Sequence, residues 1–463
     1  MNAETQSSIP PSSTPSKRSI PLHTRIFIGM IVGIVAGSLV QMLHLPEDVV
    51  NALVLVVKPV GDIFLRMLFM MVIPLILSAL VLGVAELGDL GRIGRIGLKT
   101  LIYTLLASGI SVAVGLGVYN LFQPARGLSE TDRHFLIQRF AEQAGKVQQN
   151  LQVAQEKGPM DILVTLFSKN PLEDMARAFD PSYSGGGLLA VMVFALILGL
   201  ALSVSDPEKA APVKRLLEGI YEMVMRAIGF GMLLAPFGVA ALLFVLVSTL
   251  GLSILKLLLG YVLVVLLALA IQQFVVYSLI LKFIARTSPL AFFRKIETVM
   301  LTAFSTSSSN ATLPTAIRVS VEKLKLPKEI AHFVLTIGST ANQNGTALFE
   351  GITVLFLAQC FGVSLSLTQQ VLVVLLSILA GVGTAGVPGG SLPLIMGLLV
   401  SLGVPGESIA IIYGVDRILD MSRTVLNVTG DIVAATVISR MEGHDLEADL
   451  AELAAAESGD QPT

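Results

Sequence analysis

The chain has 463 residues, of which 54% are hydrophobic and only 14% are charged, and its formal net charge is −2. About a quarter of the residues of a soluble domain are charged, so this composition indicates a membrane protein and gives no case for binding nucleic acid. The single cysteine, Cys360, excludes an internal disulfide bond and a cysteine-based metal cluster.

Long apolar segments alternate with polar loops along the chain. Residues 1–22 are rich in Ser and Pro, lack the apolar core of a signal peptide and are expected to form a disordered tail. Several later runs reach the roughly 20 apolar residues that cross a bilayer. Residues 126–158 form one long polar loop, which is expected to be extracellular, and residues 443–463 form an acidic tail, which is expected to be cytoplasmic. We expect helices at about 24–44, 50–86, 93–122, 160–204 (broken), 210–249, 252–285, 328–362 and 405–440.

Two further apolar segments, 289–325 and 368–402, are interrupted in their middle. The polar cluster Ser305–Thr312 breaks the first, and the Gly-rich cluster Gly381–Ser391 breaks the second. Such broken segments in two halves of a chain are typical of re-entrant hairpins, whose unwound tips line a polar cavity. The sequence therefore predicts an all-α polytopic membrane protein with eight transmembrane helices and two re-entrant helical hairpins.

Basic residues predict the orientation in the membrane. Arg and Lys gather in alternate loops, for example Arg92, Arg95 and Lys99 in one loop and Lys282 and Arg286 in another. These loops share one side of the membrane if both interrupted segments enter and leave by the same face. The side richer in Lys and Arg is normally cytoplasmic. We therefore expect a multi-pass cell-membrane protein with both termini cytoplasmic, in a bacterial inner membrane.

The first interrupted segment carries the run SSSNATLP, which begins at Ser307. As a hairpin tip, this run would offer hydroxyls and backbone amides to an anion. Alternatively, the serines bond to their own backbone. The alternative from a different class is an intramembrane serine hydrolase that uses Ser308 or Ser309. A serine nucleophile needs a base, however, and no His lies nearby in the sequence, which argues against this alternative.

The sequence NQNGT at 342–346 interrupts the next apolar segment. Unwound carbonyls together with amide oxygens suit a hard cation such as Na⁺, although a kink whose amides bond the neighbouring backbone is the alternative. The Gly-rich cluster follows no strand and is therefore not a dinucleotide-binding loop. Its Pro388 and paired glycines favour a flexible gate.

The most informative segment is DRILDMSRTVLNVTGD at 416–431, within an otherwise apolar stretch. Ionisable groups at membrane depth normally face a partner, a cavity or a substrate, so this segment predicts one wall of a buried polar site. A structural ion pair between Asp420 and Arg423 is the alternative, but it leaves the later polar residues unexplained. Polar residues recur at spacings of three and four from Asp416 onward. These spacings place five of the later side chains on one helical face: Asp420, Arg423, Thr424, Asn427 and Asp431.

These motifs, in this order, resemble the dicarboxylate/amino acid:cation symporter family, which includes the excitatory amino-acid transporters. The match covers nearly the whole membrane part, including VKPVGDIFLRMLFMMVIPL at 57–75 and PMDILVTLFSKNP at 159–171. The resemblance implies a homotrimer in which a transport domain slides against a scaffold by an elevator mechanism. The implied scaffold comprises residues 23–92 (helices 1–2) and 159–250 (helices 4–5), and the transport domain comprises residues 93–125 (helix 3) and 251–442 (helix 6, hairpin 1, helix 7, hairpin 2 and helix 8).

The resemblance also implies the roles of individual residues. The planar fork of Arg423 would bind the side-chain carboxylate of the substrate, and Asp420 would accept its ammonium group. Further substrate contacts are implied for Ser308, Ser309, Thr346, Val387, Thr424 and Asn427. Ligands of two Na⁺ ions are implied at Gly338, Thr340, Asn342, Val382, Thr384, Asn427 and Asp431.

The chain departs from the family pattern at a third Na⁺ site, which is expected to be degenerate. Asn344 and Gln343 stand where the family motif NMDGT has Asp and Met. Thr104 and Ala107 stand where Tyr and Thr are common, whereas Ser108 is retained.

The sequence therefore predicts a secondary active symporter, not an enzyme, that imports aspartate or glutamate together with Na⁺. Asp420 favours an amino acid over a plain dicarboxylate, because succinate has no ammonium group to pair with it. The competing hypothesis is an H⁺-coupled symporter of the same fold for an acidic amino acid or a dicarboxylate, with Asp420 or Asp431 as the proton carrier.

Overall fold

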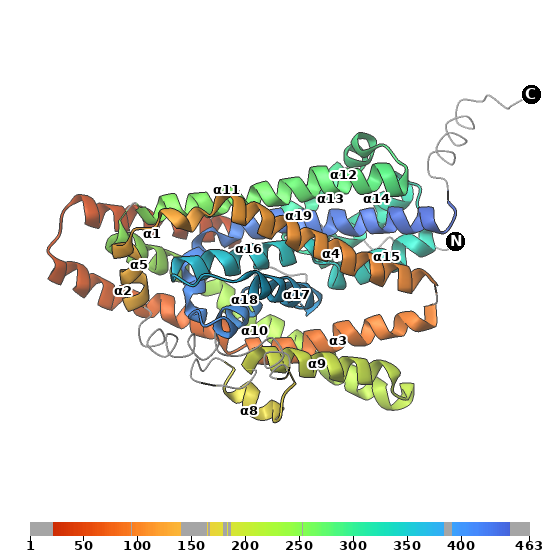
Figure 1. The fold of residues 1–463 in the computed structure, drawn as a ribbon, viewed down its shortest axis with the longest axis horizontal. Coiled ribbons are helices and arrows are strands. Elements are labelled where there is room, and N and C mark those ends of the chain that lie inside the picture. Colours follow the sequence, from red (N-terminus) through yellow and green to blue (C-terminus); the bar gives the residue numbers. More distant parts are fainter. Residues whose placement is uncertain are drawn as a thin grey trace, which may run out of the picture.

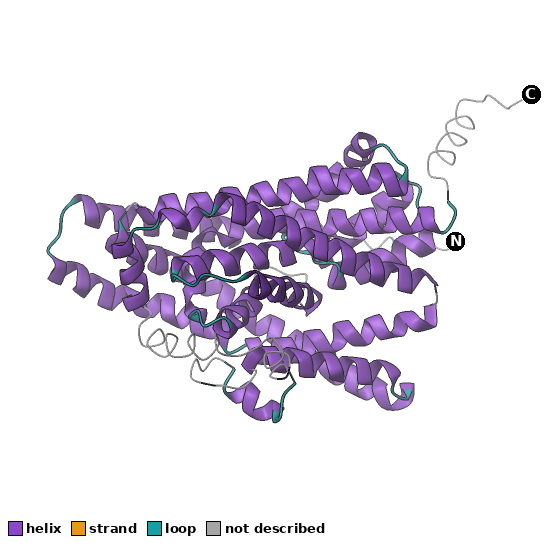
Figure 2. Ribbon diagram, in the orientation of Figure 1, coloured by secondary structure: helices purple, strands orange, loops and turns teal. Residues whose placement is uncertain are grey.

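A computed structural model describes residues 22–93, 95–139, 164, 167–178, 183, 187–251, 253–383 and 391–444. Every regular element in these ranges is a helix, and they contain no strand (Figure 2). This confirms the predicted all-α class. Five helical stretches are long and apolar enough to cross a membrane, which fits a multi-pass membrane protein: Thr24–Met42, Glu47–Ala85, Arg95–Gly127, Pro207–Thr249 and Ile254–Ala285.

The long helices run side by side along one axis of the molecule (Figure 1). One group packs around α10, with α1 and α2 on it and α9 on α3. Gly29 and Gly33 of α1 allow a close approach to α10, because a Cβ at either position would collide with the carbonyl of Pro236 or Ala240. The bounds of this group are α1 Leu22–Met42, α2 Glu47–Phe69, α3 Val72–Ile93, α9 Gly187–Val204 and α10 Pro207–Leu250.

The single helix predicted at 50–86 is wrong, since the chain forms α2 and α3 with a break at Met70 and Met71. Pro74 accounts for the break, because it has no N–H to donate to the carbonyl of Met70. At the break, the backbone N–H of Met71 donates to the carbonyl of Leu68, three residues earlier, at 3.0 Å.

The buried centre is formed by α4, α11, α16 and α19 (Figure 1). Every residue of α16 except Gln359 is buried, and so is most of α19 from Ile411 to Ser439. The polar segment predicted at 416–431 therefore lies inside the protein. The bounds are α4 Arg95–Phe122, α11 Ser253–Ile271, α16 Asn344–Cys360 and α19 Ala410–Met441, with π turns at Gln272–Val276 and Leu281–Ala285 on either side of α12 (Tyr277–Ile280).

The first of the two interrupted segments breaks where the sequence predicted. In the first, α13 (Pro289–Thr306) and α14 (Ser309–Glu322) pack against each other and are joined at Ser307, whose φ is +51°. In the second, α17 (Leu367–Gly383) precedes α18 (Leu392–Ser401), and the intervening residues 384–390 lie outside the described part of the chain. Residues 342–343 separate α15 (Lys328–Ala341) from α16.

The remaining elements are short. Of the predicted loop at 126–158, the structure describes η1 (Pro124–Gly127) and α5 (Glu130–Arg139), and the rest of the loop lies outside the described residues. α8 (Pro171–Ala176) precedes α9, and η4 (Gly406–Ile409) precedes α19. The predicted tails, 1–22 and 443–463, fall almost wholly outside the described residues.

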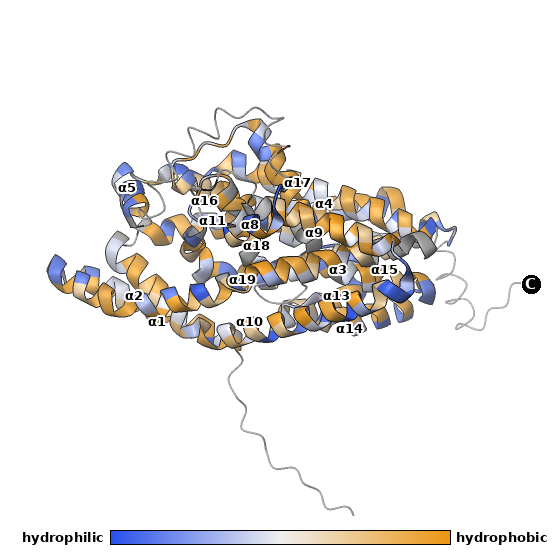
Figure 3. Ribbon diagram, turned by 90° about the horizontal axis from the view of Figure 1, so that it is seen from below, coloured by the Kyte–Doolittle hydropathy of each residue, from blue (hydrophilic) through white to orange (hydrophobic). Residues whose placement is uncertain are grey.

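Apolar side chains cover much of the outer surface. Hydrophobic residues dominate the long helices, and hydrophilic residues gather near the helix ends (Figure 3). Large apolar side chains such as Leu55, Leu121 and Phe237 are exposed. An apolar surface of this extent is unusual for a soluble monomer and suits contact with lipid.

Candidate functional site

The centre of the site is the guanidinium of Arg423, in the middle of α19. Its Nη1 donates to Oδ1 of Asp416 at 3.1 Å, and its Nη2 donates to Oδ1 of Asp420 at 2.7 Å. Its Cζ lies 4.3 Å from the ring centroid of Phe349. All three charged side chains are less than 10% exposed. Two carboxylates and an aromatic face therefore hold one buried cation in a fixed orientation.

A second arginine reaches the same carboxylate. Nη1 of Arg417 lies 3.3 Å from Oδ2 of Asp420, so Arg417 and Arg423 contact different oxygens of Asp420. The hydroxyl of Thr424 donates to the backbone carbonyl of Asp420 at 2.7 Å, within the same helix. The alternative ion pair between Asp420 and Arg423 is thus present, and it belongs to a larger charged cluster.

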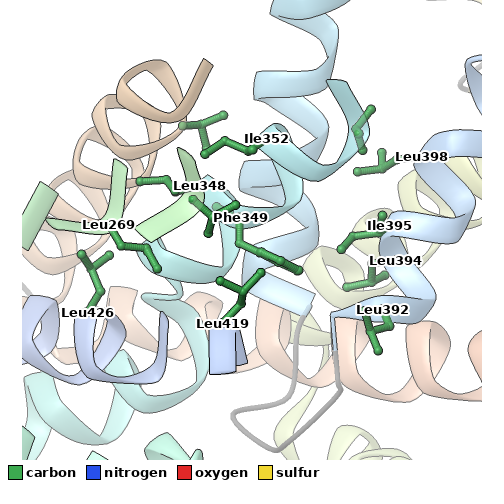
Figure 4. Close-up of a cluster of buried hydrophobic side chains, with 14 of the residues drawn as sticks. Leu269, Leu348, Phe349, Ile352, Leu392, Leu394, Ile395, Leu398, Leu419 and Leu426 are labelled. Atoms are coloured by element: carbon green, nitrogen blue, oxygen red, sulfur yellow. The ribbon is translucent and has the colours of Figure 1, made fainter. Parts of the chain in front are cut away.

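An apolar wall borders this charged cluster. Phe349 extends from α16 toward Leu419 of α19, and Leu394 and Ile395 of α18 lie on the far side (Figure 4). These side chains are fully buried. Charges interact more strongly beside such a wall than in water, because the local dielectric constant is lower.

The side chain of Asn427 is bonded to the NQNGT segment. Its Oδ1 accepts from the backbone N–H of Gly345 at 2.7 Å and of Thr346 at 3.3 Å. Its Nδ2 donates to Oε1 of Gln343 at 2.5 Å and to the hydroxyl of Thr346 at 3.0 Å. The break between α15 and α16 is therefore stabilised by α19 and presents its polar atoms toward it.

Asp431 meets the same break one turn further along α19. Its Oδ1 accepts from Nδ2 of Asn342 at 2.9 Å, and both side chains are buried. Oδ1 of Asn342 is buried without a hydrogen-bond partner among the described residues. Gly338 lies directly against the carboxylate, and a Cβ there would collide with it. A carboxylate and an unpartnered amide oxygen suit a hard cation.

Asn344 is the central residue of the third Na⁺ site that the sequence predicted to be degenerate. Its Oδ1 accepts from the hydroxyl of Ser108 at 2.7 Å, and its Nδ2 donates to the hydroxyl of Tyr277 at 3.1 Å. Its backbone carbonyl accepts from Ser111 at 3.0 Å. Thr104 and Ala107 are also buried, and they lie on α4 together with Ser108 and Ser111. The amide thus uses a donor and an acceptor, which a carboxylate could not reproduce.

The SSSNATLP run lies at the α13–α14 turn. Ser308 is the N-cap residue of α14, and its hydroxyl accepts from the backbone N–H of Ala311 at 3.2 Å. Ser309 is buried at the first helical position, and α14 packs against α19. This turn supplies the capped N-terminus of a helix close to the charged helix.

Four predicted site residues are described only in part or not at all. The backbones of Thr340 and Val382 lie in the last turns of α15 and α17, and nothing further is described of their side chains. Thr384 and Val387 lie outside the described residues.

Sequence reasoning missed several residues of the cluster. Asp416 lies seven residues before Arg423, a spacing that returns to the same helical face and could have revealed it. Arg417 and Phe349 gave no comparable signal, because their contacts depend on side-chain direction and on packing between α16 and α19. Tyr277 is 67 residues from Asn344, so only the fold brings the two together.

Comparisons with known proteins find one family model and several relatives that cover most of the chain. Residues 22–441 match the model of the Sodium:dicarboxylate symporter family. The chain is 36% identical over 422 residues to the proton/sodium-glutamate symport protein of Bacillus subtilis (91% of this chain, 93% of the relative). It is 33% identical over 424 residues to the proton/glutamate-aspartate symporter of Escherichia coli (91% and 93%). It is 29% identical over 445 residues to the C4-dicarboxylate transport protein of Rhodospirillum rubrum (96% and 93%).

Proposed function

The chain belongs to the sodium:dicarboxylate symporter family, and we propose that it is a secondary active symporter that imports aspartate or glutamate together with Na⁺. Relatives named for glutamate or aspartate symport support this substrate class. One observation carries the proposal. A buried, aromatic-backed guanidinium lies one helical turn from a buried carboxylate, so one site offers a partner to each end of an acidic amino acid.

The substrate would exchange with the internal ion pairs. Its side-chain carboxylate would take the fork of Arg423, and its ammonium group would take an oxygen of Asp420. Desolvation is costly for both partners, so a ligand that satisfies only one of them binds less well. This requirement gives the site its preference for an amino acid.

Neighbouring polar groups would complete the substrate site. The α13–α14 turn would contribute Ser308 and Ser309, and the α15–α16 break would contribute Thr346. Thr424 and Asn427 would contribute from α19, and Val387 through its backbone. The packing of α14 and α16 against α19 supports this assignment.

We assign one Na⁺ site to Gly338, Asn342, Asn427 and Asp431. The support is the buried Oδ1 of Asn342, which has no partner among the described residues and lies on the residue that contacts Asp431. A second site would use the backbone carbonyls of Thr340, Val382 and Thr384. We propose that the third site, at Thr104, Ala107, Ser108 and Asn344, does not hold a cation.

Proton coupling is the second candidate. The relatives include a protein named as a proton/glutamate-aspartate symporter, and Asp420 or Asp431 would then carry the proton. The unpartnered oxygen of Asn342 favours Na⁺, because a neutral amide oxygen can bind a cation but cannot carry a proton near neutral pH.

We further propose the finer architecture of the family resemblance: eight transmembrane helices, two re-entrant hairpins at α13–α14 and α17–α18, and a homotrimer with an elevator mechanism. Residues 23–92 and 159–250 would form the scaffold, and 93–125 and 251–442 the transport domain. Both termini would be cytoplasmic, in a bacterial inner membrane. Five long apolar stretches and two shorter ones, Ala190–Val204 and Leu367–Ile378, support this topology.

The decisive experiment is uptake of labelled aspartate and glutamate into proteoliposomes, with Na⁺ and H⁺ gradients imposed separately. We expect uptake with a Na⁺ gradient alone and recovery of chemically unchanged substrate. Uptake driven only by a pH gradient would replace Na⁺ by H⁺. Hydrolysed product without accumulation would instead support the serine hydrolase. Against that alternative, Ser308 already has a structural role as the N-cap residue of α14.

A further inference from the structure

The carboxylate of Asp420 contacts two arginines of its own helix, one through each oxygen. Oδ1 accepts from Nη2 of Arg423 at 2.7 Å, and Oδ2 accepts from Nη1 of Arg417 at 3.3 Å. Arg417 is 14% exposed on its side chain, and its Nε is buried without a hydrogen-bond partner among the described residues. Arg417 is therefore directed into the cluster and not into solvent.

The two arginines differ in their other contacts. Arg423 also binds Asp416 and stacks on Phe349, so several groups hold its guanidinium in place. Among the described residues, Arg417 forms an ion pair with Asp420 alone. If a ligand carboxylate takes over the guanidinium of Arg423, Asp420 loses its shorter ion pair and keeps the pair with Arg417.

The consequence depends on the ligand. An acidic amino acid returns a positive charge to Asp420 through its ammonium group. A dicarboxylate such as succinate returns no positive charge, so the buried carboxylate of Asp420 would rely on Arg417 for more of its charge compensation, and losing compensation of a buried charge is unfavourable.

We propose that Arg417 is a specificity-determining positioning residue, which compensates Asp420 and so sets how strictly the site requires an ammonium group on its ligand. This inference rests on the proposed function. Arg417 contacts Asp420 and not the substrate, and its effect passes through the charge of Asp420.

The test is isothermal titration of the purified full-length protein, in saturating Na⁺, with L-aspartate and with succinate. The wild type should bind both ligands, with aspartate the tighter. Arg417→Met should weaken succinate at least about tenfold more than aspartate, because an ionic hydrogen bond to a buried carboxylate is worth roughly one to two powers of ten in affinity. Arg417→Lys keeps the charge and should keep the ratio of the two dissociation constants within about threefold.

A double-mutant cycle separates this mechanism from loss of packing. In an Asp420→Asn background there is no carboxylate to compensate, so adding Arg417→Met should change succinate affinity by less than about twofold. Arg226→Met is the matched control, because it removes an arginine from an exposed i,i+4 pair with Glu222 on α10. It should leave both affinities unchanged.

Several results would overturn the inference while leaving the proposed function intact. The first is that Arg417→Met weakens the affinity for aspartate and for succinate equally. The second is that Arg417→Met weakens succinate affinity as much in the Asp420→Asn background as in the wild type. The third is a wild type that binds aspartate but no succinate. A wild type that binds neither ligand would instead contradict the proposed function itself.

Discussion

Arg423 and Asp420 form a buried ion pair within one turn of α19, with Nη2 and Oδ1 2.7 Å apart. Asp416 binds the other terminal nitrogen of the same guanidinium. A buried charge that loses its partner is costly, so these contacts make the polar face of α19 sensitive to single substitutions.

Arg423→Ala should abolish binding of acidic substrates. The variant removes the partner of a buried carboxylate, which costs about 3–5 kcal/mol, or roughly two to four powers of ten in affinity. Arg423→Lys keeps the charge without the fork and should recover only part of the loss. Isothermal titration with aspartate measures both variants. Near-wild-type affinity in Arg423→Ala would remove Arg423 from the substrate site.

Asp420→Asn should weaken aspartate far more than succinate, because only the ammonium group of aspartate needs the charge. We expect at least about a tenfold difference between the two losses, measured by the same titration. Equal losses would mean that Asp420 acts only as the structural partner of Arg423. Thermal unfolding of the variant serves as the control for folding.

Gly338→Ala should weaken Na⁺-dependent binding. The added methyl group would collide with the carboxylate of Asp431, and overpacking of this kind costs about 1–3 kcal/mol. We expect the Na⁺ concentration for half-maximal aspartate binding to rise. Gly219→Ala on α10 is the matched control, because a Cβ there meets nothing within 4 Å. An unchanged Na⁺ dependence in Gly338→Ala would argue against a cation beside Asp431.

Glu442 should give stability that depends on pH. Its carboxylate binds Lys99 at 2.7 Å and Arg95 at 2.5 Å, which joins the start of α4 to the end of α19. Hydrogen bonds from Lys99 and Arg95 lower the pKa of Glu442 below its ordinary 4.5. A lowered pKa means that the stabilisation is present above the unfolded-state pKa and is lost as the pH falls through the folded-state pKa.

Glu442→Gln should therefore lower the unfolding temperature slightly at pH 7, by about 1–2 °C, as expected for an ion pair at the surface. The difference from the wild type should shrink as the pH falls below 4.5. Glu222→Gln, in the exposed pair on α10, is the control. A difference that grows at low pH would contradict the sign of this effect.

Local sequence signals predicted the helical class, the break at Ser307 and the polar face of α19, because composition, periodicity and turn residues act over a few residues. They missed the break at Met70 although Pro74 stood in the sequence, since a proline can also be accommodated within a helix, as Pro59 is. Contacts between distant helices could not be predicted. The bond between Asn344 and Tyr277 requires the packing of α16 beside α12, which no local pattern encodes.

The last prediction concerns the number of coupled cations. Both ends of the Asn344 amide are hydrogen-bonded by neutral groups, since its Oδ1 accepts from Ser108 and its Nδ2 donates to Tyr277. A desolvated Na⁺ at this point would lack a compensating carboxylate, which is unfavourable in a medium of low dielectric constant. Asn344→Asp would supply that charge, and the hydroxyl of Ser108, which donates to Oδ1 of Asn344, could still donate to it.

We therefore expect Asn344→Asp to raise the slope of log affinity for aspartate against log Na⁺ concentration by up to about one, since each coupled Na⁺ contributes about one to this slope. Asp431→Asn should lower the slope, because it removes the carboxylate of the first proposed site. Asn170→Asp is the matched control, because Asn170 caps α8 at the surface and Asp caps a helix equally well. A wild-type slope as steep as that of a relative with the NMDGT motif would show that the third site binds Na⁺ despite Asn344. Repeating the titration at several pH values checks the coupling ion, because affinity that follows pH and not Na⁺ would establish proton coupling instead.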